Sequence, residues 1–213
     1  PRQNVLSHVP RDARTLLDVG CNTGAFGEAL KQERPGICVW GVEPIEGAAE
    51  IAATRYDHVV TGSYPDALAA ADAQFDCIVF NDVLEHLVDP ESALKKAGEL
   101  LRPGGAVVAS IPNMRYLPVL RDLVTRAEWR YSSEGVLDRT HLRFFTHKSI
   151  AEMFTESGYR IVTLEGINAR PTSWKFRALN LVTSNAFADL RYLQFAIVAT
   201  RVDPLDCSDR PMG

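Results

Sequence analysis

The chain has 213 residues, of which 46% are hydrophobic and 23% charged, as in soluble globular proteins and unlike disordered or collagen-like chains. The length fits a single α/β domain over residues 1–213, and the apolar runs fall short of the roughly 20 residues that a membrane-spanning helix needs. Residues 1–14 lack the hydrophobic stretch of a signal peptide, and the cysteines form no C-x-x-C pair. We therefore expect a cytoplasmic protein with reduced thiols.

The net charge of −4 hides an asymmetry along the chain. Residues 114–177 contain 11 Lys and Arg against 7 Asp and Glu, a surplus of +4, which leaves 12 against 20 elsewhere. A protein whose whole surface binds a phosphate backbone would be basic throughout, so nucleic acid is not the expected partner. An anionic small molecule would bind best in the later segment.

Short β-branched or apolar runs recur along the chain and alternate, at first, with helical segments. This alternation predicts an α/β fold with a doubly wound, mostly parallel, seven-stranded sheet, because each parallel crossover needs a helix. The predicted strands are residues 15–19, 37–42, 58–61 (the weakest), 76–80, 106–111, 159–164 and 195–200.

Two helices have clear end signals. Asp89 is a good N-cap followed by Pro90 at the first helical position, and the Pro-Gly-Gly run at 103–105 is expected to stop that helix. Thr146 can cap a second helix, which Gly158 would end.

Two segments, 113–146 and 166–192, are longer than ordinary connections, and both contain aromatic and basic residues. Such length is typical of lids and binding loops. We expect them to lie together over one end of the sheet and to cover the acceptor. The polar stretch 203–213 is expected to be a flexible tail.

A glycine-rich turn follows the first predicted strand in the run LLDVGCNTG at 16–24. Glu43 and Pro44 follow the second strand about 20 residues later, where an acidic side chain binds a ribose diol. Together these features predict an adenosine-type ligand. Asp18 at the start of the turn would repel a pyrophosphate but suits an ammonium group, and Asn22 stands where a dinucleotide turn has its middle glycine.

At this run the chain resembles the class I S-adenosylmethionine (SAM)-dependent methyltransferases, whose first motif reads close to LDVGCGTG. The resemblance extends to residues 75–87, which look like the family's fourth motif and the helix after it. Residues 100–105 look like the turn before its fifth strand. The resemblance implies a Rossmann-like methyltransferase fold, SAM as cofactor and S-adenosylhomocysteine (SAH) as product.

The resemblance also implies roles for individual residues. Asp18, Gly20 and Gly24 would hold the methionine portion, and Glu43 would bind the ribose hydroxyls. Because asparagine tolerates positive φ, Asn22 in place of glycine should preserve binding. The other implied cofactor residues are Cys21 and Pro44 beside these motifs, Gly62 and Ser63 near the adenine edge, and Asn81 beside the sulfonium.

Methyl transfer needs little from the protein beyond aligning the acceptor and removing its proton, because the cofactor supplies an activated methyl group. Asp82, Glu85 and His86 have i, i+3, i+4 spacing and would share one face of a helix after the fourth strand. His141 could approach from the first long segment. We predict His86 or His141 as the general base for a hydroxyl, with Glu85 beside it.

The same residues permit an alternative. D-x-x-E-H with a later histidine is similar to the E-x-x-E-H pattern of metal-dependent methyltransferases that modify small-RNA 3′ ends and of quinone-biosynthesis O-methyltransferases. A divalent ion held by Asp82, Glu85, His86 and His141 would clamp a vicinal diol. Asp82 departs from the pattern, and histidine is an uncommon magnesium ligand, so the metal-free base is the prediction. His86 could also simply bond to backbone at a helix end.

Arg139 and Arg143 flank His141 and, with Tyr116, are the predicted acceptor-binding residues. Arginine forks suit carboxylate and phosphate, so a nucleotide-linked or lipid-linked sugar is a candidate acceptor, although the segment could be a solvated loop. The run DRTHLRFFT also resembles bacterial methyltransferases of surface-polysaccharide and secondary-metabolite pathways. The remaining alternatives are an RNA terminal-ribose 2′-O-methyltransferase, a nonenzymatic adenosyl-ligand sensor and, less favoured, a nicotinamide oxidoreductase.

Overall fold

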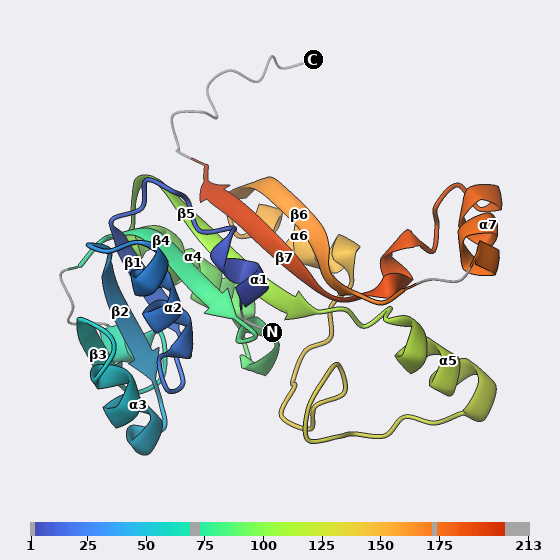
Figure 1. Cartoon of the computed structure of the whole chain (residues 1–213), viewed down its shortest axis with the longest axis horizontal. Helices are drawn as coiled ribbons and strands as arrows, with labels where there is room; N and C mark the ends of the chain where they lie inside the picture. Colours follow the sequence, from blue (N-terminus) through green and yellow to red (C-terminus); the bar gives the residue numbers. More distant parts are fainter. Residues whose placement is uncertain (1–2, 69–72, 172–173, 203–213) are drawn as a thin grey trace, which may run out of the picture.

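A computed structural model describes residues 3–68, 73–171 and 174–202. Its described part contains a seven-stranded sheet with the order β3-β2-β1-β4-β5-β7-β6 (Figure 1). Neighbouring strands from β3 to β5 are parallel, and β7 runs antiparallel to both β5 and β6. The predicted doubly wound sheet is therefore confirmed. The strands are β1 Thr15–Val19, β2 Cys38–Glu43, β3 His58–Thr61, β4 Phe75–Asn81, β5 Leu101–Pro112, β6 Tyr159–Ala169 and β7 Tyr192–Arg201.

Helices cover both faces of the sheet because successive residues of the central strands point to opposite sides. Leu16 packs with side chains of α1, α2 and α3, whereas its neighbour Leu17 belongs to the core that α4 and α6 cover. None of the described helices is long and apolar enough to cross a membrane. The helices are α1 Gln3–Leu6, α2 Ala25–Glu33, α3 Glu46–Ala53, α4 Pro90–Leu100, α5 Leu117–Arg126, α6 His147–Glu156 and α7 Trp174–Val182, with 3₁₀ turns η1 Asp66–Leu68, η2 Leu84–His86 and η3 Ala188–Arg191.

The predicted helix starts are confirmed. Asp89 accepts a hydrogen bond from Ser92 N at the start of α4, and Thr146 forms a capping box with Ser149 at the start of α6. The predicted stop is confirmed, because α4 ends at Leu100, just before the Pro-Gly-Gly run. The predicted start of the next strand at 106 was wrong: residues 103–105 already lie within β5, where the register against β4 shifts. Extended backbone is favoured before a proline, which ends the helix there.

Parts of the second long segment are strand. Residues 166–169 continue β6 and residue 192 begins β7, paired from Gly166↔Phe195 to Ala169↔Tyr192. The two long segments meet at the carboxyl end of β5 (Figure 1), where Arg115 forms an ion pair with Asp189 at 3.3 Å. Residues 203–213, including Cys207, lie outside the described residues. The other three cysteines are free thiols.

Asp76 fastens the start of β4 to the start of β1. Its Oδ2 accepts hydrogen bonds from Arg14 N at 2.8 Å and Thr15 N at 2.9 Å, and its Oδ1 accepts one from Arg102 Nη1 at 3.1 Å. Partial burial raises the pKa of Asp76, but these bonds outweigh burial and hold the pKa below its ordinary value of 3.8.

Asp76→Ala should therefore lower the free energy of unfolding at pH 7 by about 1.5–3 kcal/mol, the range for hydrogen bonds to a charged group. Because the pKa is lower in the folded chain, this stabilisation is present above the unfolded value of 3.8 and is lost as the pH falls through the folded value. Urea unfolding at pH 7 and below pH 4 measures both effects, with exposed Asp66→Ala as the control. Equal stabilities of wild type and D76A at pH 7 would contradict the assignment.

Candidate active site

The glycine-rich turn after β1 adopts left-handed backbone at three positions. Gly20 has φ 68°, Asn22 has φ 50° and Gly24 has φ 78°, so asparagine takes the conformation that the sequence required of it. Cys21 between them is buried. A Cβ at Gly20 would lie 2.8 Å from Val83 Cγ2, so glycine is needed for the turn to approach the segment after β4.

Beneath this turn, Asp18 is buried and accepts a 2.5 Å hydrogen bond from the Tyr56 hydroxyl, which in turn accepts one from Gly27 N. Burial and the Asp18 charge raise the pKa of Tyr56, so the phenol stays protonated and donates. The Tyr56 ring fits because Gly27 and Gly41 have no side chain: a Cβ at these positions would lie only 2.5 Å and 2.9 Å from the ring. Sequence reasoning missed Tyr56, since no local pattern marks a contact across 38 residues.

Glu43 lies where the sequence predicted, at the end of β2 beside the turn. It is 5% exposed; its Oε2 accepts a hydrogen bond from Asn22 N at 2.8 Å, and its Oε1 accepts one from Ile45 N at 3.0 Å. A carboxylate offers about four acceptor positions, so these bonds fix the group and leave capacity for a ligand diol. Pro44 follows and is exposed.

The remaining predicted cofactor residues lie at the ends of neighbouring strands. Gly62 N donates to Glu43 O at 2.9 Å, which holds Gly62 and Ser63 against the end of β2. Asn81 closes β4, is 3% exposed and accepts a hydrogen bond from Ser110 Oγ. Its Nδ2 has no hydrogen-bond partner among the described residues. A buried donor without an acceptor costs free energy, so this amide fits a ligand acceptor.

A cavity of about 250 Å³ lies beside these strand ends. Four carboxylates and two histidines line it, with no Lys or Arg among the described lining residues, so it favours positive charge. The lining residues are Asp82, Glu85, His86, Pro112, Glu134, Gly135, Val136, Asp138, His141, Leu193 and Gln194.

The chain after β4 forms the short 3₁₀ turn η2 and not the predicted regular helix, and Asp82 before this turn has a left-handed conformation with φ 58°. Asp82, Glu85 and His86 still line the same cavity. Ser110 Oγ lies 2.8 Å from Asp82 Oδ1, and Gln194 Nε2 donates to the same oxygen at 2.6 Å. Sequence reasoning missed both neighbours because they come from β5 and β7.

The two histidines are oriented by backbone carbonyls. His86 Nδ1 lies 3.1 Å from Thr140 O, and His141 Nδ1 lies 3.0 Å from Val136 O. A carbonyl only accepts, so each Nδ1 carries a proton, and in a neutral imidazole the lone pair is then on Nε2. His86 thus lines the cavity and also has the backbone hydrogen bond that was its alternative role.

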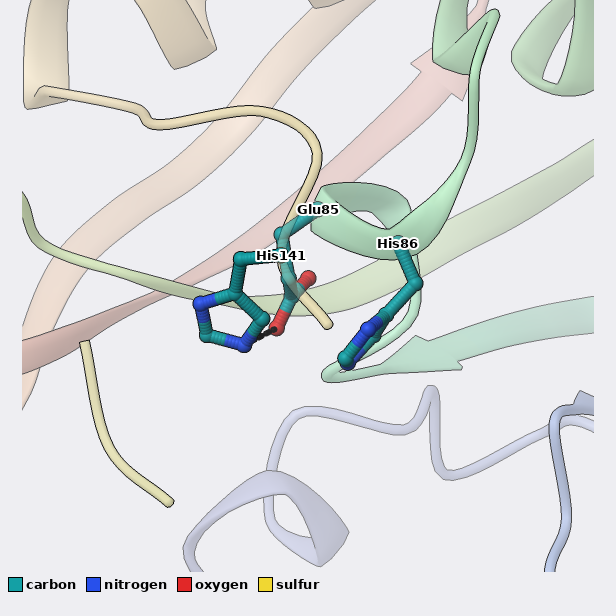
Figure 2. A group of neighbouring side chains, drawn as sticks. All are labelled: Glu85, His86 and His141. Atoms are coloured by element: carbon teal, nitrogen blue, oxygen red, sulfur yellow. Dashed lines mark ion pairs between the residues drawn. The ribbon is translucent and has the colours of Figure 1, made fainter. Parts of the chain in front are cut away.

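Figure 2 shows Glu85 from η2 and His141 from the loop turned toward each other, with His86 beside them. His141 Nε2 lies 3.9 Å from Glu85 Oε1, and the two imidazole centroids are 4.8 Å apart. Burial, then the neighbouring His86, lower the pKa of His141, which keeps that imidazole neutral at pH 7. Burial, then the Asp82 charge, raise the pKa of Glu85.

Glu85 is 1% exposed, and neither of its carboxylate oxygens has a hydrogen-bond partner among the described residues. One ligand atom each from Glu85, His86 and His141 lies within 4.8 Å of the others. Such a nitrogen and oxygen donor set can accept a proton or hold a divalent cation.

The predicted acceptor-binding residues do not line this cavity. Arg143 is exposed and donates to Val88 O at 2.6 Å, and exposed Arg139 donates to Ser132 O at 3.5 Å. Backbone carbonyls on the loop surface thus hold both guanidinium groups. Tyr116 precedes α5, with the Arg170 guanidinium carbon 6.0 Å from its ring centroid.

Comparison with known proteins identifies the family. Residues 2–164 match the family described as "Methyltransferase domain". A ubiquinone biosynthesis O-methyltransferase of Cereibacter sphaeroides strain KD131 is 30% identical over 177 residues, which cover 79% of this chain and 69% of the relative.

Solved structures support the fold. A SAM-dependent methyltransferase from Archaeoglobus fulgidus matches with a TM-score of 0.65 at 20% identity, covering 93% of this chain and 94% of that one. The plantazolicin methyltransferase BamL, solved with SAH, matches with a TM-score of 0.63 at 13% identity, covering 93% of this chain and 82% of that one. The chain belongs to the methyltransferase-domain family and is a class I SAM-dependent methyltransferase.

Proposed function

We propose that the enzyme transfers the SAM methyl group to a hydroxyl of a small-molecule or glycan acceptor that enters the acidic cavity. The observation that carries this proposal is the pair of imidazoles whose Nδ1–H groups are held by backbone carbonyls, which makes Nε2 the atom of the neutral ring that can accept a proton. The C. sphaeroides relative is named as an O-methyltransferase, which supports oxygen as the methylated atom.

For the cofactor, we propose a site along the carboxyl ends of β1, β2 and β4. Glu43 has acceptor capacity left for the ribose diol, and the Asn81 amide needs an acceptor. Asp18 supplies negative charge at the methionine end and acts as a positioning residue, since its carboxylate is bonded to Tyr56. When bound, SAM supplies an electrophilic methyl group on a sulfonium.

For the proton, we propose His141 as the base, with His86 as its neighbour in the cavity. A neutral imidazole can take the hydroxyl proton at Nε2, and the hydrogen bond from Nδ1–H to Val136 O stabilises the imidazolium that results. Glu85, which is buried 3.9 Å from Nε2, is a positioning residue.

His141→Ala should reduce turnover by about 10²–10⁴, the usual contribution of a general base. A smaller loss is expected for His86→Ala, and neither change should alter the affinity for SAH, since both residues face the acceptor cavity. Initial rates and SAH calorimetry measure the two effects once an acceptor is identified. Exposed His147→Ala is the control. Full activity in both H86A and H141A would show that alignment alone is responsible for catalysis.

The geometry of Glu85, His86 and His141 also favours a second candidate mechanism, in which a divalent cation acidifies the acceptor hydroxyl. Chelator treatment separates the two mechanisms. The metal-free base predicts unchanged turnover after chelation, with no gain on adding Mg²⁺ or Mn²⁺. Turnover that is lost on chelation, that a divalent ion restores in the wild type and that the ion does not restore in E85Q would instead support the metal mechanism.

Glu43→Ala should weaken SAH binding by about 1–3 kcal/mol, because the diol loses a charged hydrogen-bond acceptor. Calorimetry measures the change, and the thermal shift on adding SAH checks that the variant is folded. The matched control is exposed Glu46→Ala in the first turn of α3. Equal affinity for SAH in wild type and E43A would place the ribose elsewhere.

A further inference from the structure

A second cavity of about 220 Å³ lies at the same end of the sheet, among α5, the end of β6, α7 and η3. Three arginines from different parts of the chain line it, Arg121, Arg170 and Arg191, together with apolar side chains that include Leu117 and Phe176. We call it the arginine cavity. Figure 1 shows α5 and α7 beyond the sheet on this side.

The positive charge in the arginine cavity is only partly compensated. Arg121 forms an ion pair with Asp122 at 2.8 Å, whereas no salt bridge to Arg170 or Arg191 occurs within residues 3–68, 73–171 and 174–202. No carboxylate is among the described residues that line the cavity. Three guanidinium groups around one small space therefore attract an anion.

Arg170 and Arg191 are also held in place for binding. Arg170 N donates to Arg191 O at 2.8 Å, which joins the two residues through the backbone. The Arg191 guanidinium lies 5.2 Å from the Tyr192 ring centroid, and that of Arg170 lies 6.0 Å from the Tyr116 ring centroid. Arg191 Nε is buried and has no hydrogen-bond partner among the described residues. A buried charged donor without a partner is costly, so an anion here would relieve that cost.

Residues at the start of β7 and directly before it line the two cavities. Arg191 lines the arginine cavity, and Gln194, three residues later, lines the acidic cavity. Arg191 ends η3 and β7 begins at Tyr192, so these three residues span at most about 10 Å between the two Cα atoms. One small molecule can span that distance, with a hydroxyl beside His141 and an anionic group among the arginines.

We propose that the arginine cavity binds a phosphate or diphosphate group of the acceptor whose hydroxyl is methylated in the acidic cavity. This rests on the proposed function of the acidic cavity. Four carboxylates there repel an anion, so an anionic acceptor must direct its charge elsewhere. Arginine forks match phosphate oxygens, and the aromatic neighbours leave the edges of the forks open to donate. The substrate class is a phosphorylated or nucleotide-linked small molecule, such as a sugar phosphate.

Inorganic pyrophosphate is the probe, titrated by calorimetry into the full chain with SAH present. Arg170→Ala and Arg191→Lys should each weaken its binding about tenfold or more, since each removes a charge-assisted fork. R191K keeps the charge and the packing of the stem, which guards against misfolding. Arg130→Ala, exposed and outside the cavity, is the matched control and should leave binding unchanged. SAH affinity should be the same in every variant.

Three results would overturn the proposal: no pyrophosphate binding, equal binding in wild type and both variants, or loss in R130A as large as in R170A. If SAH still binds in those cases, the failure belongs to the arginine cavity and not to the methyltransferase function. Sedimentation with phosphatidylglycerol vesicles distinguishes a lipid phosphate from the phosphate of a soluble acceptor. Vesicle binding that R170A abolishes, with no competition by pyrophosphate, would assign the arginines to a lipid surface and contradict a soluble acceptor.

Discussion

Parallel pairing from β3 to β5 makes the carboxyl ends of these strands meet at one edge of the sheet, and everything functional in this molecule depends on that constraint. The turn after β1, the end of β2 and the end of β4 supply Asp18, Glu43 and Asn81. Antiparallel β7 begins at the same edge and contributes Gln194. The long connection after β5 and the one before β7 therefore start and finish beside this edge, where they build both cavities.

Electrostatics divides this edge into two regions of opposite sign. The acidic cavity suits a cationic donor group, and its buried histidine is kept neutral by desolvation. The same environment raises the pKa of the buried Glu85 carboxyl, first through burial and then through the charge of Asp82. The arginine cavity, which is lined by residues directly before β7, carries the opposite charge. An acceptor with a hydroxyl at one end and an anion at the other would be oriented by this field before any specific contact forms.

Local signals in the sequence predicted local structure well. The caps at Asp89 and Thr146 and the left-handed Asn22 are properties of a few consecutive residues, and each is observed. The predicted start of β5 at 106 and the predicted end of β6 at 164 were wrong, because pairing with a distant strand extends both strands through glycine residues.

The candidate site was predicted only in part, because some of its residues come together only through long-range pairing. Glu85, His86 and His141 lie in one cavity. The resemblance to a family identified these three residues together, since their joint position could not be read from their spacing alone. Arg139 and Arg143 flank His141 in sequence but contact loop carbonyls. The arginines that share a cavity, including Arg170 and Arg191, are brought together by β-sheet pairing across 21 residues, which no local pattern encodes.

A crystal structure of the chain with SAH tests the central claim most directly, because it locates the sulfur from which the methyl group leaves. The account predicts the ribose hydroxyls on Glu43 and the sulfur beside Asn81, opening onto the cavity that His141 lines. A sulfur separated from that cavity by packed protein, or a ribose bound away from Glu43, would contradict it.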